Sequence, residues 1–402
     1  MITIGLIGKT NVGKTTFFNA ATLLEKEVSN YPFTTKEPNI GTAYAKTICV
    51  CKEFNVKCQP NNSVCIEGYR FIPVRIIDVP GLIKGAWRGK GLGNKFLSVA
   101  ARSDALIHIV DASGGIDAEG NIVKPGVGDP IKDFFDVENE IVNWFESILR
   151  KNMRDISKFF KRVGRMDAPI YKILSGLKIS LNDISEALNK LGLYEKDIAL
   201  WSDEEYRNFA KIIRRMKPTL IVANKMDVRG SEKNYDRLMD KLNDYIIVPC
   251  SAEAELALRR AVFSGLIEYI PGEEKFFIKD ESKLNEKQKW AIKYLEERVM
   301  DKWIRTGIQD SIDITVFKLL GMNTVYPVAD EKTLTDNKGK VLPDVYLLPP
   351  NSTLKDLAML VHSELADSLL YGIDARSGIR LPKNYRLRDR DVIKLVTTSK
   401  KR

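Results

Sequence analysis

The chain has 402 residues, 44% of them hydrophobic and 29% charged, which is typical of a globular protein with two or three domains. It contains no run of ~20 apolar residues that could span a membrane and begins without a signal-peptide pattern, so we expect a cytoplasmic protein with no membrane partner. The formal charge of +10 favours polyanionic partners such as RNA, although a lysine-rich surface also serves solubility.

The first predicted element is a buried strand over Ile2–Ile7, followed by a glycine-rich turn and a helix from Lys14 to Leu24. The turn reads GKTNVGKT and fits the phosphate-binding pattern G-x-x-x-x-G-K-S/T in the context that this pattern requires. Backbone N–H groups of such a loop surround phosphate oxygens, so we expect Lys14 to reach the β- and γ-phosphates and Thr15 to bind Mg²⁺. The other contacts predicted from this segment involve Gly8, Asn11, Val12, Gly13 and Thr16.

The next segment, Tyr31-Pro32-Phe33-Thr34-Thr35, is rich in turn-forming residues. One of its two threonines is expected to bind Mg²⁺ and to sense the γ-phosphate, so that the loop is ordered only with the triphosphate bound. We favour Thr35 for this role, with Thr34 as the alternative.

Four of the five cysteines, Cys49, Cys51, Cys58 and Cys65, lie close together in the sequence and can supply four thiolates to zinc. Cys49 and Cys51 would point to the same face of one strand and the other two could return on a hairpin, so a disulfide is a second interpretation. Reduced thiols packed in a loop are the third.

The apolar run Phe71–Ile77 predicts a strand that leads into Asp78-Val79-Pro80-Gly81. An aspartate at a strand end can hold Mg²⁺ through water, and Gly81 lets its backbone N–H approach the γ-phosphate. Where many GTPases carry a glutamine near this turn, this chain has Leu82. An apolar side chain cannot orient the attacking water, so we expect slow hydrolysis of the bound nucleoside triphosphate.

The run Ala105–Val110 predicts another buried strand, after which strand signals stop between about residues 133 and 216. Helical periodicity at Val137–Arg150 and Leu181–Leu191 instead predicts a helical insertion in the sheet domain. Its stretch 150–165 is dense in Lys and Arg with two phenylalanines between them, which favours either a face for RNA or a solvated helix with core-facing aromatics.

The predicted strand Thr219–Ala223 leads into the motif N-K-x-D, which contains Asn224, Lys225 and Asp227. An aspartate in the plane of the base accepts hydrogen bonds from guanine N1–H and the exocyclic amine, a pattern that adenine does not offer. The predicted strand Tyr245–Val248 is followed by Ser251 and Ala252, and the backbone N–H of Ala252 can reach guanine O6. We therefore predict that the chain binds GTP and GDP.

The C-terminal quarter has a different pattern. A connecting helix is predicted over Leu284–Ile304. Beyond it, strands at Ile314–Leu319, Val341–Leu348 and Asp391–Val396 and a helix at Thr353–Leu370 predict a small α+β module that is large enough to fold alone.

These motifs resemble a known family. The Tyr-Pro-Phe-Thr-Thr run, the Asp78–Leu82 segment and Gly89–Asn94 are similar to the Obg-type translation-factor GTPases, specifically the YchF-like branch. The C-terminal module resembles the ubiquitin-like TGS domain at Asp344–Pro349, Ser352–Ala358, Ala375–Gly378 and Asp389–Lys394. The resemblance implies an α/β P-loop GTPase domain with a mostly parallel sheet and a helical insertion, followed by an α+β β-grasp domain. It also implies a partner in the ribosome, rRNA or tRNA.

The best-known YchF proteins lack the aspartate of N-K-x-D and prefer ATP, whereas this chain has Asp227 and so resembles a GTP-specific sister group. Several similar GTPases bind K⁺ at the position of Asn11, so K⁺ can supply missing transition-state stabilisation, unless Asn11 only bonds the loop backbone. The predicted function is a switch with slow Mg²⁺-dependent GTP hydrolysis, and the alternative is a nucleotide-gated RNA-binding adaptor in which hydrolysis is incidental. The predicted catalytic residues are Lys14, Thr35, Gly81 and Asn11.

The predicted boundaries are a GTPase domain at 1–134 and 217–275, a helical insertion at 135–216, a helical connector at 276–311 and a TGS domain at 312–399. A monomer is favoured.

Overall fold

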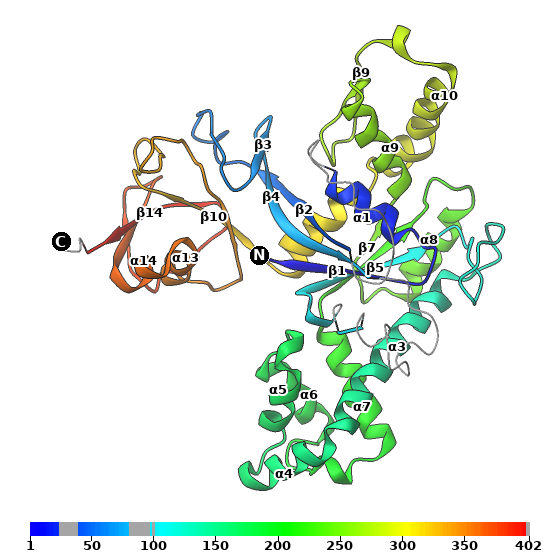
Figure 1. Ribbon diagram of the computed structural model, residues 1–402, viewed down its shortest axis with the longest axis vertical. Helices are drawn as coiled ribbons and strands as arrows, with labels where there is room; N and C mark the ends of the chain where they lie inside the picture. Colours follow the sequence, from blue (N-terminus) through cyan, green and yellow to red (C-terminus); the bar gives the residue numbers. More distant parts are fainter. Residues whose placement is uncertain (24–38, 80–96, 99–100, 399–402) are drawn as a thin grey trace. The chain divides into compact units, whose positions relative to one another are not determined.

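The computed structural model describes residues 1–23, 39–79, 97–98 and 101–398 (Figure 1). The chain divides into two compact units. The first unit comprises Thr3–Gly41 and Arg75–Ser311, and the second comprises Met1–Ile2, Thr42–Val74 and Ile312–Arg402. Residues 42–74 thus group with the C-terminal part of the chain, whereas the predicted boundaries place them in the N-terminal domain. Those domain boundaries stay a prediction.

The largest sheet is mostly parallel, with the strand order β2-β4-β1-β5-β6-β7 and β3 paired to β4. The first unit contains β1, the end of β4, β5, β6 and β7, whereas β3, most of β2 and the start of β4 fall within residues 42–74 of the second unit. Strand β1 is parallel to β4 and β5, β5 to β6, and β6 to β7, so the carboxyl ends of these strands share one edge. Every residue of β5 and β6 is buried, as expected for central parallel strands. The strands are β1 Thr3–Ile7, β2 Asn39–Ile48, β3 Val64–Ile66, β4 Tyr69–Asp78, β5 Ala105–Asp111, β6 Thr219–Asn224 and β7 Ile247–Pro249.

Helices cover both faces of this sheet. Figure 1 shows α1 (Lys14–Thr22) and α9 (Ala252–Phe263) on one face and α3 (Pro130–Lys151) on the other. Helix α3 also packs against α8 (Ser231–Lys241). It begins before its predicted start because Asp129 accepts a hydrogen bond from the backbone N–H of Ile131 and so caps the helix.

The segment between β5 and β6 consists mainly of helices from Pro130 onward. Two of its helices begin with capping boxes, made by Ser180 with Asp183 and by Ser202 with Glu205. Their apolar faces share one core with α3. The bounds are α4 Met153–Val163, α5 Asp167–Leu174, α6 Leu181–Leu191 and α7 Asp203–Met216, with short 3₁₀ turns at Ser175–Leu177 and Ile198–Leu200. The predicted helix at Leu181–Leu191 is confirmed.

The remainder of the first unit is a short hairpin and a helical connector. Strands β8 (Ile267–Glu268) and β9 (Phe277–Ile278) pair antiparallel. The predicted connecting helix is present, although one stretch of it is a π-helix. Its parts are α10 Glu286–Leu295, the π-helix Glu296–Met300 and α11 Asp301–Trp303, preceded by a 3₁₀ turn at Glu281–Lys283. Among the helices that the structure describes, none combines the length and apolar composition needed to cross a bilayer.

The second unit contains a mixed sheet in the order β11-β10-β14-β12-β13, which confirms the predicted small α+β module. Strand β10 is parallel to β14, whereas β11, β12 and β13 pair antiparallel with their neighbours. Two helices pack on the sheet, one through Leu354 and Leu357 and the other through Ala366. The elements are β10 Asn323–Val328, β11 Tyr346–Leu348, α13 Leu354–Val361, α14 Ser363–Ser368, β12 Leu369–Asp374, β13 Arg380–Leu381 and β14 Asp391–Thr397.

The strand predicted at Ile314–Leu319 is wrong. This segment is a π-helix that continues α12 (Ile308–Asp313), and the first strand of the module is β10. Ile308, Ile312 and Val316 are all buried at helical spacing, which periodicity alone does not separate from a short buried strand.

Two other predicted elements, one helix and one strand, are shorter in the structure than expected. The helix predicted at Thr353–Leu370 is interrupted at His362, whose backbone is extended (φ −166°, ψ 136°), and its last residues belong to β12. Of the strand predicted at Val341–Leu348, only Tyr346–Leu348 forms β11.

Strands β2 and β3 escaped prediction. Cys49 and Cys51 follow β2 in a turn, so the expectation that both lie on one strand is wrong. Cys65 does return on a hairpin, because β3 pairs antiparallel with β4.

Candidate functional site

The loop at residues 8–15 joins the carboxyl end of β1 to the start of α1. Gly13 has a left-handed backbone (φ 98°), and a Cβ there would overlap the side-chain amide of Asn224, so glycine is required. Asn11 also adopts a positive φ of 63°. A loop of this shape at a helix N-terminus directs backbone N–H groups toward a bound anion. The structure therefore places the predicted phosphate-binding residues in a suitable conformation.

Lys14 lies in this loop with a side chain that is almost fully buried. Its ammonium donates a hydrogen bond of 2.6 Å to the carbonyl of Lys9. Burial lowers the pKa of Lys14 to about 8, and the nearby Asp78 carboxylate opposes this shift. A phosphate group placed here would favour the charged form of Lys14.

Thr15 and Asp78 form a pair of oxygen donors beside the loop. The Thr15 hydroxyl donates to Asp78 Oδ2 at 2.9 Å, whereas the buried Asp78 Oδ1 has no hydrogen-bond partner among the described residues. Burial raises the pKa of Asp78, and Thr15 and Lys14 oppose the increase. Hard oxygen ligands with an unsatisfied buried carboxylate oxygen suit Mg²⁺. The structure therefore brings together two of the three predicted metal ligands.

Asn224, at the end of β6, links the phosphate loop to the candidate base pocket. Its amide nitrogen donates to the carbonyl of Val12 at 2.9 Å, and its amide oxygen accepts from the backbone N–H of Ala252 at 3.0 Å. Both side-chain ends are thus engaged in a buried position. Asn224 joins three predicted segments into one site.

Asp227 and Ser251 also meet. The Ser251 hydroxyl donates to Asp227 Oδ1 at 2.5 Å, which holds one carboxylate oxygen in place. The backbone carbonyl of Asp227 accepts hydrogen bonds from Tyr294 Oη (3.0 Å) and Arg298 Nε (3.2 Å) of the connector. The two connector residues were not predicted, because no local motif ties residue 227 to a helix so far along the chain.

Lys225 lies beside the phosphate loop. Its ammonium donates to the carbonyl of Asn11 at 3.1 Å and forms an ion pair of 2.8 Å with the buried Asp111 at the end of β5. The Asn11 amide nitrogen donates to the carbonyl of Gly120 at 3.0 Å. Asp111 was missed from the sequence, although its position at a strand end was a usable signal.

Four positions discussed from the sequence lie outside the described residues: Thr34, Thr35, Gly81 and Leu82. Thr16 lies in the first turn of α1 and is half-buried.

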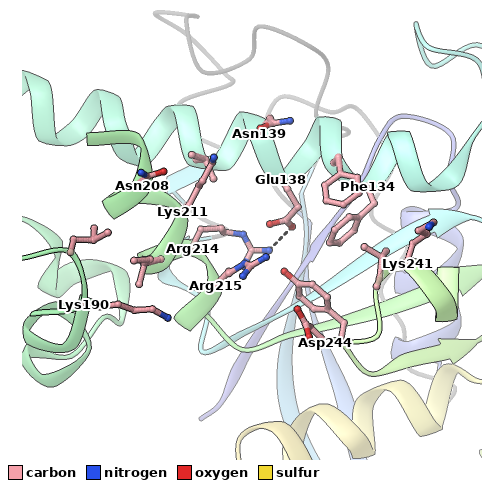
Figure 2. A pocket seen from close by; sticks show the side chains of 16 residues that line it. Phe134, Glu138, Asn139, Lys190, Asn208, Lys211, Arg214, Arg215, Lys241 and Asp244 are labelled. Atoms are coloured by element: carbon pink, nitrogen blue, oxygen red, sulfur yellow. Dashed lines mark hydrogen bonds and ion pairs between the residues drawn. The ribbon is translucent and has the colours of Figure 1, made fainter. Parts of the chain in front are cut away.

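A cavity of about 530 Å³ lies in the first unit, between α3, α7 and the segment before β7 (Figure 2). Arg214 is neutralised there by Glu138 at 2.7 Å. Lys190, Lys211 and Arg215 also line the cavity, and no ion pair to them occurs in the described part of the chain. This cavity is basic, and it is separate from the residues predicted for the nucleotide.

Family models match three parts of the chain. A model described as the Obg-like GTPase YGR210-like, G4 motif-containing domain matches residues 222–330. A 50S ribosome-binding GTPase model matches residues 3–137, and a TGS domain model matches residues 332–397.

Several proteins are similar over most of their length. An uncharacterised GTP-binding protein of Methanocaldococcus jannaschii is 45% identical, with 100% of both chains covered. An uncharacterised GTP-binding protein of Schizosaccharomyces pombe is 31% identical with 94% of each covered, and the ribosome-binding ATPase YchF of Bacillus subtilis is 27% identical with 85% and 83% covered. The crystal structure of a GTP-binding protein from Pyrococcus horikoshii OT3 has 36% identity and a TM-score of 0.77, with 99% of this chain and 100% of that chain covered.

Proposed function

Because this chain belongs to the Obg-like, YchF-related GTP-binding proteins with a TGS domain, we propose that it is a switch that hydrolyses GTP slowly and acts on the ribosome or its RNA. The observation that carries the proposal is the convergence of separated motifs. Asn224 bonds to both Val12 and Ala252, so the phosphate loop and the candidate base pocket form one site.

Guanine selectivity is assigned to Asp227. The Ser251 hydroxyl holds the Asp227 carboxylate, and the connector holds its backbone carbonyl. Because the side chain is already ordered, it should lose little conformational entropy when the base binds. A preorganised carboxylate accepts from both guanine donors, and a buried acceptor left unpaired by adenine is unfavourable.

Thr15 and Asp78 are the described residues that would hold Mg²⁺, with Thr35 as the proposed third ligand. When bound, Mg²⁺ supplies positive charge between the β- and γ-phosphates. Lys14 adds charge on the same phosphates, and the loop N–H groups and that of Gly81 are proposed to orient them. Because Leu82 offers no polar atom to the attacking water, the intrinsic rate should be low.

K⁺ is a proposed additional ion at Asn11. The amide nitrogen of Asn11 already donates to the carbonyl of Gly120, so the amide oxygen is the atom proposed to bind the cation. This hydrogen bond also fits the simpler interpretation, in which Asn11 only bonds backbone, and the two interpretations are separated by the ion-replacement prediction below.

Helix α4 supports a partner with phosphate groups. Its exposed basic residues recur at helical spacing along one side. They are Arg154, Lys158, Lys161 and Arg162, and Arg165 follows just after the helix ends at Val163. The phenylalanines between them are not presented to bases, because Phe160 packs on the helical core and Phe159 lies beneath the ammonium of Lys172 at 5.6 Å. We therefore propose that α4 contacts RNA phosphates through charge alone.

The names of relatives point in the same direction, since one is a ribosome-binding ATPase. The test is cosedimentation of the full chain with ribosomal subunits, with a non-hydrolysable GTP analogue, with GDP and without nucleotide. Turnover of GTP is measured in parallel with and without ribosomes. We expect stronger association with the analogue than with GDP and faster turnover with ribosomes.

If the protein associates with ribosomal subunits equally well in all three nucleotide conditions, the switch proposal is contradicted. Nucleotide-dependent association without faster turnover would favour the alternative, an RNA-binding adaptor in which hydrolysis is incidental.

A further inference from the structure

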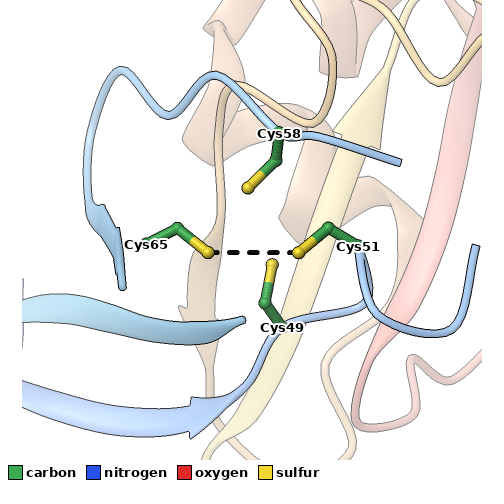
Figure 3. A group of neighbouring side chains, drawn as sticks. All are labelled: Cys49, Cys51, Cys58 and Cys65. Atoms are coloured by element: carbon green, nitrogen blue, oxygen red, sulfur yellow. Dashed lines mark hydrogen bonds between the residues drawn. The ribbon is translucent and has the colours of Figure 1, made fainter. Parts of the chain in front are cut away.

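The four clustered cysteines converge in the second unit (Figure 3). Their Sγ atoms all lie within 4.8 Å of one another, and those of Cys51 and Cys65 are 4.0 Å apart. Cys49 and Cys51 come from the turn after β2, Cys58 from the following loop and Cys65 from β3. Three different local segments thus direct their thiols to one point.

The spacing of the sulfur atoms distinguishes a metal site from disulfides. A disulfide bond is about 2.05 Å long, and all four cysteines are free thiols. In a tetrahedral zinc site with Zn–S distances of about 2.3 Å, neighbouring sulfurs lie about 3.8 Å apart. The observed sulfur–sulfur distances are closer to about 3.8 Å than to about 2.05 Å, and all four sulfurs are close to one another. The group therefore fits one tetrahedral metal ion better than two disulfide bonds.

A buried arginine supplies an independent reason to expect negative charge here. Arg70 on β4 is fully buried and lies within hydrogen-bonding reach of Cys49. Its terminal nitrogens donate to Ser63 Oγ at 3.0 Å and to the carbonyl of Leu342 at 2.8 Å, but its Nε has no hydrogen-bond partner among the described residues. Among the described residues no carboxylate forms an ion pair with Arg70. The positive charge of Arg70 does act on Asp344, where it opposes the rise in pKa that burial causes.

A buried guanidinium without a counter-charge is strongly unfavourable. Four thiolates around one divalent cation carry a net charge of about −2, which a neighbouring guanidinium partly neutralises. Thiolate sulfur also accepts hydrogen bonds, and hydrogen bonds to the ligands of a metal orient them. Arg70 is therefore placed where it can compensate part of the negative charge of a tetrathiolate site and donate a hydrogen bond to one of its ligands.

The loop that carries the cysteines has little regular structure of its own. It is attached to the rest of its unit by hydrogen bonds from the backbone of Gln59 to Val341 (2.8 Å) and from Asn61 to Pro343 (2.7 Å). Val50 and the cysteines share a hydrophobic cluster with Tyr326. A bound ion would fix this irregular loop, since small segments with few core residues commonly depend on a metal.

We propose that Cys49, Cys51, Cys58 and Cys65 bind one zinc ion and that this ion makes residues 49–65 a structural part of the second unit. All four positions around the ion are filled by protein, which is the arrangement of structural rather than catalytic zinc. The site is separate from the proposed nucleotide function and does not depend on it.

The experiment measures metal in the full chain purified under reducing conditions. We expect about one zinc per chain by elemental analysis, released in proportion when a mercurial reagent titrates the thiols. After removal of zinc, Co²⁺ should give the absorption of a tetrahedral thiolate complex. These measurements use the unaltered protein, so they remain valid even if variants fold poorly.

Variants then locate the ligands. Cys58→Ser and Cys65→Ser should lose the zinc, whereas Cys250→Ala should keep it, because the fifth cysteine is buried in the first unit and has no part in the cluster. Folded, reduced protein that contains no zinc and takes up no Co²⁺ overturns the proposal. So does a disulfide among the four cysteines found by mass spectrometry, and iron in place of zinc overturns the assignment of the ion.

Discussion

At the scale of single residues, the candidate base pocket depends on Asp227. We expect Asp227→Asn to weaken GTP binding roughly tenfold to a hundredfold, because an unsatisfied polar group at a buried contact costs about 1–3 kcal/mol. The amide can donate to the additional oxygen of xanthine, so xanthosine nucleotides should bind better than guanosine nucleotides. Competition binding measures both effects.

The matched control is Asp236→Asn, the same change at an exposed position of α8. It should leave the nucleotide preference unaltered. If Asp227→Asn behaves like this control, Asp227 does not contact the base.

Lys14 predicts a pH dependence of nucleotide affinity. Its pKa in the free protein is lowered to about 8 by burial, and a bound triphosphate favours the protonated form. Below that pH the lysine is already charged, so affinity should change little through this group. Above it, binding must take up a proton, and affinity should fall by up to about tenfold per pH unit.

Calorimetric titration in buffers of different ionisation enthalpy measures this proton uptake. Lys14→Met should bind the nucleotide more weakly and should no longer take up a proton on binding above about pH 8. Titration of the nucleotide itself persists in both proteins. Equal proton uptake by the two proteins would refute the assignment to Lys14.

Replacing K⁺ with Na⁺ tests whether Asn11 binds K⁺ or only hydrogen-bonds the backbone. If K⁺ binds at its amide oxygen, replacing K⁺ with Na⁺ should slow GTP turnover by up to about a hundredfold, since one preorganised electrostatic contact contributes roughly 3 kcal/mol. Asn11→Ala should remove the difference between the two ions. Equal rates in K⁺ and Na⁺ for the unaltered protein would leave Asn11 with its bond to Gly120 alone.

The residues of the candidate site that were predictable are those in local motifs. The spacing of Gly8, Gly13 and Lys14 is imposed by a single loop, and the sequence shows it directly. The contacts of Asp111 with Lys225 and of Tyr294 with Asp227 join segments far apart in the chain. They depend on how those segments pack, which no local pattern encodes.

At the scale of elements, strands with strong apolar runs were predictable and irregular ones were not. Strand β5 is buried along its whole length, and its sequence ALIHIVD is apolar except at His108 and Asp111. Strand β2 has mixed burial and little hydrophobic signal. At residues 314–319, a short apolar run fits either a strand or a helix, and packing at the positions of Ile312 and Val316 selects the helix.

The basic side of α4 gives a prediction at this scale. The double variant Lys158→Glu, Arg162→Glu should bind ribosomal RNA more weakly than the unaltered protein. The slope of log affinity against log salt should become shallower by about one for each phosphate that the variant no longer neutralises. Both side chains lie on the solvent side of the helix, so the fold should be unaffected. Filter binding at several salt concentrations provides the measurement.

Lys287→Glu on α10 is the control, since this lysine is also exposed but lies on a different helix. Equal reductions in affinity for the α4 and α10 variants would indicate that only the net charge of the protein matters.

At the scale of the whole molecule, the chain forms two compact units that do not follow its linear order. Residues 42–74 belong with the C-terminal module because of contacts such as that of the Asn62 amide with the carbonyl of Val345, at 2.9 Å. The sequence indicates both folds, but it does not indicate this grouping. Hydrogen bonds between residues so distant in the chain leave no periodic or local signature.

The division predicts that nucleotide and zinc stabilise the chain through different residues. With Mg²⁺ present, GDP at about a hundred times its dissociation constant should stabilise the unaltered protein by about 2.7 kcal/mol. Lys14→Ala should lose this stabilisation and keep its zinc, because Lys14 lies in the first unit and the cysteines in the second. Cys58→Ser should show the reverse, with no zinc but with a rise in unfolding temperature on addition of GDP.

Differential scanning calorimetry of the three proteins, with and without GDP and with metal content determined on the same samples, tests the prediction. The exposed substitution Lys287→Ala is the reference for Lys14→Ala and should retain both ligands. A Lys14→Ala protein that still responds to GDP would count against the phosphate-loop assignment. Loss of zinc by the same protein would show that the two units fold as one, because removing a charge from a loop in the first unit can reach the cysteines only through the folding equilibrium that both units share.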